Sequence, residues 1–239
     1  MNPDLLKSNF DRMLLHAGWG DPVDGLWFIG IEEGSGWVGG PEVVGKWFAD
    51  SAERIQSLAG MTYESGIAAE GLPAARGSKV KYWEQKIVDG LRALESQSQN
   101  DVAPALWSPG SKVFHSNLYP LARPRVMSQP PYFATHFGVT DAGAYRDRVF
   151  ESRFAALQRL RVTAGPQAIV CFGKGFWPEF AWLLSLDPGL AREGGGGNFR
   201  YFDEAHVVLA PFFGWWHMSG KKAQDISAKL HEWNVKLDY

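Results

Sequence analysis

Four short apolar runs predict the strands of a buried sheet. They cover residues 26–31, 112–118, 168–173 and 206–211, and each is rich in β-branched and aromatic residues. Runs of this length and composition are typical of strands that are covered on both faces. Apolar residues at three- and four-residue steps predict two amphipathic helices, one over 145–160 and one over 223–233.

The alternation of strands and helices predicts an α/β fold, a three-layer α/β/α sandwich around a mainly parallel sheet of four strands. A helical crossover returns the chain to a parallel position in the same sheet, which is why this alternation favours parallel pairing. Four stretches rich in turn residues are predicted as loops: 58–79, 96–110, 124–143 and 187–204. None of them separates two self-sufficient hydrophobic sets. We therefore expect a single domain over residues 1–239.

Composition and charge exclude several classes of protein and of binding partner. With 45% hydrophobic and 21% charged residues the chain is typical of a soluble globular protein. No segment approaches the roughly 20 apolar residues that cross a bilayer, so no membrane partner is expected. Cys171 is the only cysteine, which excludes a cysteine-ligated zinc or iron–sulfur centre and indicates a reducing, cytoplasmic location. The net charge of −2 gives no global attraction for nucleic acid, so phosphate contacts would need a local basic rim.

Familiar phosphate, dinucleotide and metal motifs do not fit this chain. Residues 40–46 have the spacing of a phosphate-binding loop, but Trp47 replaces the Ser or Thr that ligates magnesium and Glu42 would repel phosphate. The tetrapeptide 203–206, Asp-Glu-Ala-His, matches a helicase motif by letters only, because it enters a predicted strand instead of leaving one. The glycines of 30–36 lack the dinucleotide spacing, and the histidines lack paired ligand spacing. We expect no cofactor and no metal.

Polar residues follow the first and the last predicted strand. Glu32 and Glu33 follow the first strand, and His217 follows the apolar run 207–216. In an open α/β sheet, ligands bind beyond the carboxyl ends of the strands. These residues are therefore candidates for acid–base chemistry in one cleft.

The order of these strand ends resembles the uracil-DNA glycosylase superfamily over most of the chain. Residues 30–34, Gly-Ile-Glu-Glu-Gly, are similar to the family's first loop, with Glu32 where the family handles the catalytic water or cation and Glu33 in place of a proline. Asn117, at the end of the second predicted strand, matches the asparagine that reads the flipped base. Residues 217–219, His-Met-Ser, are similar to the family's His-Pro-Ser, whose histidine faces the leaving base.

The resemblance implies a monofunctional DNA glycosylase that hydrolyses the N-glycosidic bond of a flipped-out base and leaves an abasic site. Glu32 would stabilise the positive charge that develops on the sugar or orient water, and His217 would assist departure of the base. The base would be uracil or a modified pyrimidine, including a hypermodified phage cytosine, in duplex or single-stranded DNA. The role would be repair or phage defence, and we expect a monomer.

Aromatic and basic residues near the strand ends are candidates for contacts with DNA. Trp37 is expected to take part in base recognition, and Trp215 and Trp216 are candidates for a stacking platform or a wedge. The expected phosphate contacts come from the start of the last helix: Ser219, Gly220, Lys221 and Lys222.

Each assignment has a structural alternative. Asn117 can cap the turn before Pro120, and the two glutamates can cap a helix that starts near Pro41. His217 can be an ordinary loop histidine, the paired tryptophans can be partly buried, and the two lysines can be the polar face of a helix. For the function, the alternatives are a catalytically silent nucleic-acid-binding module of the same fold and a nucleoside or nucleotide hydrolase.

Overall fold

A mixed sheet runs through the part of the chain that the computed structural model describes, namely residues 14, 17–32, 79–95, 106, 111–120, 138–214 and 216–237. Its six strands lie in the order β2-β1-β3-β6-β5-β4. Their bounds are β1 Leu26–Glu32, β2 Val113–Tyr119, β3 Ala168–Phe172, β4 Arg192–Gly194, β5 Phe199–Phe202 and β6 Val207–Ala210. The strands β2, β1, β3 and β6 pair in parallel, whereas β5 and β4 extend the sheet in antiparallel fashion.

The four predicted strands are confirmed to within one residue at each end, and they form the parallel part of the sheet. Every residue of β2, β3 and β6 is buried, as expected for strands with helices on both faces. The prediction of a four-stranded sheet is wrong, because the sheet of the described residues has six strands.

The two additional strands form a hairpin inside 187–204, a segment that the sequence predicts as a loop. The hairpin turn contains Gly195, Gly196 and Gly197, whose φ values are 56°, 67° and 84°. Glycine adopts this left-handed conformation without a steric penalty. Phe199 and Phe202, at the two ends of β5, are buried in the clusters on opposite faces of the sheet. The glycine run therefore joins two short strands instead of forming a long loop.

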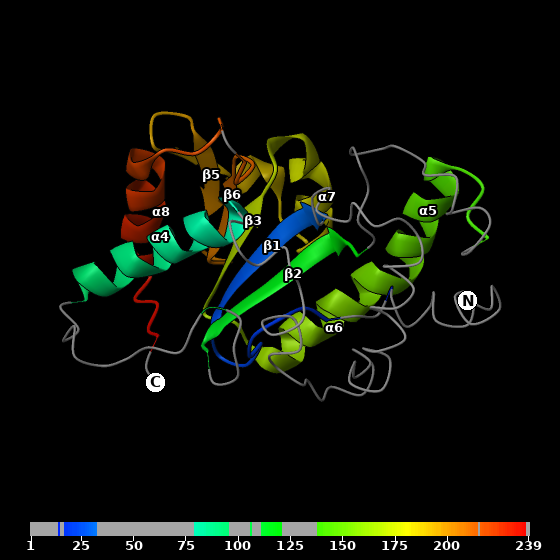
Figure 1. The fold of residues 1–239 in the computed structure, drawn as a ribbon, viewed down its shortest axis with the longest axis horizontal. Helices are drawn as coiled ribbons and strands as arrows, with labels where there is room; N and C mark the ends of the chain where they lie inside the picture. The colour runs from blue at the N-terminus through cyan, green and yellow to red at the C-terminus, as the bar shows by residue number, and fades with distance from the viewer. Residues whose placement is uncertain are drawn as a thin grey trace.

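Helices cover both faces of the sheet, which gives the three-layer α/β/α arrangement for the described residues (Figure 1). One face packs against α4 (Lys79–Leu94) and α8 (Gly220–Glu232). The other face packs against α5 (Ala142–Arg148), the π-helical segment η4 (Val149–Phe154), α6 (Ala155–Ala164) and α7 (Trp177–Leu183). In the described part of the chain, no helix has the length and apolar character needed to cross a membrane.

The predicted helices are confirmed in position but differ in detail. The helix predicted over 145–160 consists of α5, η4 and α6 in direct succession. The helix predicted over 223–233 is α8, which begins earlier because Ser219 Oγ accepts a hydrogen bond from the Lys222 backbone N–H at 3.3 Å. The sequence prediction omits α4 and α7.

Candidate functional site

The carboxyl ends of β1, β2, β3 and β6 lie at one edge of the sheet, because these strands are parallel. Gly30 pairs in register with Asn117, and Glu32 pairs with Tyr119. The loop with His217 leaves β6 at the same edge. The structure thus brings the first two predicted strand ends side by side, and it places the His217 loop three positions away from β2 in the sheet order.

The Asn117 side chain lies over Gly30, in space that a glycine leaves open. A methyl group on residue 30 would lie 2.5 Å from Asn117 Oδ1 and 2.8 Å from Cζ of Phe172. Carbon atoms do not approach other heavy atoms this closely, so a side chain at this position would push the amide or the ring away. These two side chains explain why β1 has a glycine near its end.

Asn117 makes no side-chain hydrogen bond within the described part of the chain, although the residue is only 5% exposed. Its amide donor and acceptor are therefore available to a partner from outside the described residues. The alternative of a turn cap before Pro120 would use this amide, so the structure does not favour it. The arrangement fits a group whose partner is a ligand.

Arg153 fixes the same strand end through the backbone. It is 1% exposed, and its Nε donates to the Asn117 carbonyl oxygen at 2.8 Å. The two terminal nitrogens donate to the Leu14 carbonyl at 2.9 Å and to Ser116 Oγ at 3.1 Å. Burial lowers the pKa of Arg153 to about 10, which leaves the guanidinium charged at neutral pH. The position of Asn117 is therefore set by a buried cation from η4.

A buried histidine and glutamate lie next to Asn117. His115, two residues earlier on the same face of β2, has its Nδ1 2.8 Å from Glu84 Oε1 of α4. The two residues are 4% and 0% exposed, and the His115 ring centre is 6.2 Å from that of Phe172. Sequence reasoning missed this pair, because its members are 31 residues apart. The available signal is the polar run of His115, Ser116 and Asn117 inside a buried strand.

Two phenylalanines form an aromatic wall beside Asn117. The Phe172 and Phe213 rings are stacked, with their centres 4.2 Å apart and their planes at 6°. Phe28 meets Phe213 edge-on at 6.3 Å. From the sequence, we expect tryptophans instead of phenylalanines to stack on the base. Trp37 lies outside the described residues, so its role in base recognition stays a prediction.

The loop between β6 and α8 exposes an indole and an imidazole. Trp216 is 91% exposed, so the alternative that it is partly buried is wrong. His217 is also exposed, and its ring meets Phe212 edge-on with the ring centres 6.4 Å apart. Trp215 lies outside the described residues. Both exposed side chains are accessible to a ligand at the carboxyl edge.

The two lysines after this loop have partners within the protein. Lys222 Nζ donates to the His217 carbonyl at 2.9 Å, and Lys221 pairs with Asp225 one turn further along α8. Lys222 therefore ties the histidine loop to the start of α8. Contacts of Ser219, Gly220, Lys221 and Lys222 with phosphate stay a prediction.

The candidate catalytic carboxylate is placed through its backbone only. Glu32 is the last residue of β1, beside the strand that carries Asn117. Glu33 lies outside the described residues. The catalytic assignment of both glutamates stays a prediction.

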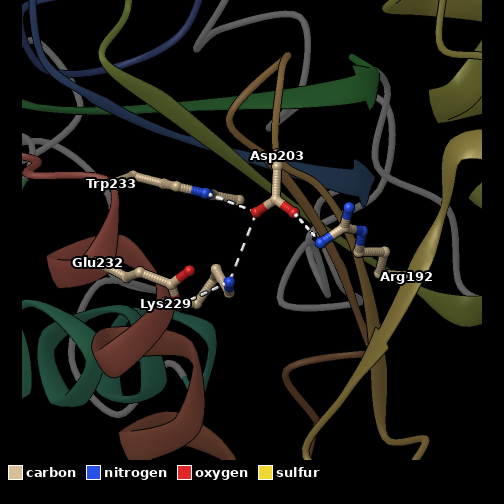
Figure 2. A network of polar contacts seen from close by, with 5 residues as sticks. All are labelled: Arg192, Asp203, Lys229, Glu232 and Trp233. Carbon is tan, nitrogen blue, oxygen red and sulfur yellow. Dashed lines mark hydrogen bonds and ion pairs between the residues drawn. The ribbon is translucent and has the colours of Figure 1, made fainter.

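The tetrapeptide 203–206 forms the turn into β6, as expected, at the edge opposite to the candidate site. Asp203 accepts a hydrogen bond from Trp233 Nε1 at 3.0 Å and pairs with Arg192 at 3.2 Å and Lys229 at 3.5 Å (Figure 2). Partial burial raises the pKa of Asp203, but the Trp233 hydrogen bond and the two cations outweigh it and lower the pKa overall. This network ties α8 to the β4–β5 hairpin.

Metal and thiol chemistry find no support in the part of the chain that the structure describes. No group of three or more His, Cys, Asp or Glu residues there is placed to hold a metal ion. Burial raises the pKa of the Cys171 thiol far above its ordinary value, so the thiol stays protonated at neutral pH.

Comparison with known proteins does not assign a family to this chain. No protein-family model matches it, and no curated protein matches it either. The functional interpretation therefore depends on the strand-end motifs and on the geometry around Asn117.

Proposed function

We propose that this protein is a DNA glycosylase that reads a flipped-out pyrimidine with Asn117. The observation that supports the proposal is the Asn117 amide, which belongs to a residue only 5% exposed, makes no hydrogen bond within the described part of the chain and lies beside Gly30 and Phe172. Open α/β sheets bind ligands at the carboxyl edge where it lies. An amide places a donor and an acceptor side by side, which complements the Watson–Crick edge of a pyrimidine.

In the proposed reaction, the bond between C1′ and the base nitrogen breaks and its electron pair leaves with the base. Glu32 stabilises the positive charge on the sugar and takes the proton of the water that adds to C1′. His217 donates a hydrogen bond to the departing base. The base leaves as an anion and takes up a proton from the solvent, and Glu32 releases its proton to the solvent. The products are the free base and an abasic site. Extruding the base costs a few kcal/mol, which contacts with Asn117 and Phe172 offset.

The proposed substrate is uracil or a modified pyrimidine, in DNA repair or in defence against phage DNA with hypermodified cytosine. The Asn117 amide can complement uracil in one orientation and a cytosine-like edge in the other. The identity of the base therefore depends on the groups that surround the amide.

The test is release of base from labelled duplex and single-stranded oligonucleotides that contain uracil, hydroxymethylcytosine or glucosylated hydroxymethylcytosine. Strand cleavage by alkali reports abasic sites, and mass spectrometry identifies the free base. The variants are Asn117→Asp, Asn117→Ala, Glu32→Gln and His217→Ala. The control is Asn234→Asp, which makes the same change at an exposed residue beyond α8.

We expect wild type and the Asn234 variant to release one of these bases, and the Asn117 variants to be slower by roughly 10²-fold or more. Circular dichroism checks that each variant is folded. Base release that is unaffected by both Asn117 substitutions would contradict the proposal. Binding of the oligonucleotides without release of any base would favour the catalytically silent module instead.

A further inference from the structure

Two exposed cations lie over one indole at the carboxyl edge, away from Asn117 and the His217 loop. Lys174 directly follows Gly173 and begins the short helix η5 (Lys174–Phe176), and Arg200 belongs to β5. Lys174 Nζ is 5.5 Å from the centre of the Trp177 ring, and Arg200 Cζ is 5.4 Å from the same centre. We call Lys174, Arg200 and Trp177 the indole-cation cluster.

The indole in this cluster is a fixed support. Trp177 is 8% exposed, and its Nε1 donates to the Ala210 carbonyl at the end of β6 at 3.1 Å. Each cation lies within 5.5 Å of the ring centre, so the two cations can be separated by at most twice that distance. Two segments that are far apart in the sequence thus present positive charge at one place.

The two charges are not neutralised within the described part of the chain. Neither Lys174 nor Arg200 forms an ion pair there, although Glu193 is the register partner of Arg200 across the hairpin. Exposed cations of α8 and β4 do have carboxylate partners, as in the pairs Lys221–Asp225 and Arg192–Asp203. An unpaired lysine and an unpaired arginine fit an anionic ligand, since both donate hydrogen bonds to phosphate oxygens.

The cluster lies at the same edge as the proposed base site. In sheet order, the edge presents Asn117 from β2, Gly30 from β1, Lys174 after β3, the His217 loop after β6, and Arg200 in β5. Four strand spacings of about 4.8 Å give roughly 19 Å from β2 to β5, which is the length of five or six phosphates along one strand of B-DNA at about 3.4 Å each. A strand whose base enters the site at Asn117 therefore reaches the cluster with a flanking phosphate.

We propose that the indole-cation cluster binds the DNA backbone beside the target nucleotide, an inference that rests on the proposed glycosylase function. The cluster is the local basic feature that a chain of net charge −2 needs for DNA binding. Lys174 and Arg200 take this role because neither has an ion-pair partner among the described residues, whereas Lys221 is paired and Lys222 donates to a carbonyl. The β4–β5 hairpin thereby gains a function, since it carries Arg200.

The test measures the affinity of the full chain for oligonucleotides of ordinary sequence that lack any target base, over 50 to 200 mM salt. The variant is Lys174→Gln with Arg200→Gln. The control is Lys112→Gln with Arg159→Gln, which removes the same charge: Lys112 directly precedes β2 at the opposite edge, and Arg159 is exposed on α6. Thermal unfolding checks that both double variants are folded.

Loss of two phosphate contacts lowers the slope of log affinity against log salt by roughly 1.8 for duplex DNA and 1.4 for a single strand. Over this salt range, wild type then loses roughly twelve times more duplex affinity than the variant. We expect this change for the Lys174/Arg200 variant and an unchanged slope for the control.

The outcomes separate this inference from the proposed function. An unchanged slope in the Lys174/Arg200 variant would show that the cluster does not bind the DNA backbone, even where wild type releases base. A reduced slope in a protein that releases no base would support backbone binding by the cluster and contradict the glycosylase function. Wild type that binds neither duplex nor single-stranded DNA would contradict the proposed role of the cluster.

Discussion

Replacing Arg153 by methionine removes three hydrogen bonds that join separate segments of the chain. The acceptors are the Asn117 carbonyl, the Leu14 carbonyl and Ser116 Oγ, at 2.8, 2.9 and 3.1 Å. Each bond to a charged donor contributes about 1.5–3 kcal/mol, but the effects are not additive, and methionine retains most of the packing of the stem. We expect the free energy of unfolding to fall by about 3–5 kcal/mol, because the substitution removes the donor from two carbonyl groups and one hydroxyl group around a buried site.

The pH dependence of this loss follows from the pKa of Arg153. Burial lowers that pKa to about 10 in the folded protein, well below the ordinary value of an exposed arginine. As pH rises, the folded state would release the proton before the unfolded state does, so the desolvation cost of the cation is relieved only above about pH 10. Between pH 6 and 9 both states are protonated. The difference in stability between wild type and the variant is therefore constant over that window.

Urea unfolding followed by circular dichroism measures this difference at pH 6, 7.5 and 9. The matched control is Arg159→Met, an exposed arginine of α6, which we expect to change the free energy of unfolding by less than about 0.5 kcal/mol. An Arg153→Met protein as stable as the control would show that the three hydrogen bonds of Arg153 do not stabilise the fold. A loss that disappears by pH 9 would show that the buried guanidinium is not the charged donor described above.

Three further outcomes follow from the structure. Asp203→Asn is expected to lower the free energy of unfolding by about 1–2 kcal/mol at pH 7, measured by urea unfolding, because Asp203 accepts from Trp233 and pairs with two cations. Since the folded-state pKa of Asp203 is lowered, this deficit should shrink as pH falls below about 4, and a deficit that is constant down to pH 2 would contradict it. Gly30→Ala should raise the activation free energy of base release by more than it lowers the free energy of unfolding, because its methyl group displaces the Asn117 amide. Base release as fast as that of wild type would contradict the geometry. Trp216→Ala should leave the melting temperature unchanged, because the side chain is 91% exposed, and weaken DNA binding by about 1–3 kcal/mol in a fluorescence titration; unchanged affinity removes Trp216 from the interface.

The parallel sheet could be predicted because its strands are continuous apolar runs. Burial on both faces removes the polar positions that would confuse the pattern, as the fully buried β2 and β3 show. The β4–β5 hairpin could not be predicted in this way, because only the ends of its four-residue strand β5 are buried and the adjoining glycines are typical of loops. Short antiparallel strands owe their conformation to pairing with β6, which the local sequence does not encode.

The candidate site could be predicted where it depends on strand ends and was missed where it depends on tertiary pairing. The sequence predicts that Gly30 and Asn117 both lie near the carboxyl ends of strands, and the structure adds that these two strands are neighbours and that the two residues pair in register. The contact between His115 and Glu84 joins β2 to α4, and Arg153 reaches β2 from η4. Neither contact has a spacing rule, since each is set by how a helix packs on the sheet.

The contacts that fix the backbone of Asn117 differ from those that its side-chain amide needs. Arg153 bonds its carbonyl, while Gly30 and Phe172 leave room for its side chain. The amide makes no hydrogen bond within the described part of the chain. A bound base with a complementary edge pairs with it, whereas a base without one covers it and leaves it unsatisfied at a cost of about 1–3 kcal/mol, which corresponds to roughly 5- to 150-fold discrimination. Because the amide can present its donor and acceptor in either order, the groups that fix its rotation decide which base gains this advantage; Phe172 lies with the amide beside Gly30, and His115, two residues earlier on β2, is held by Glu84.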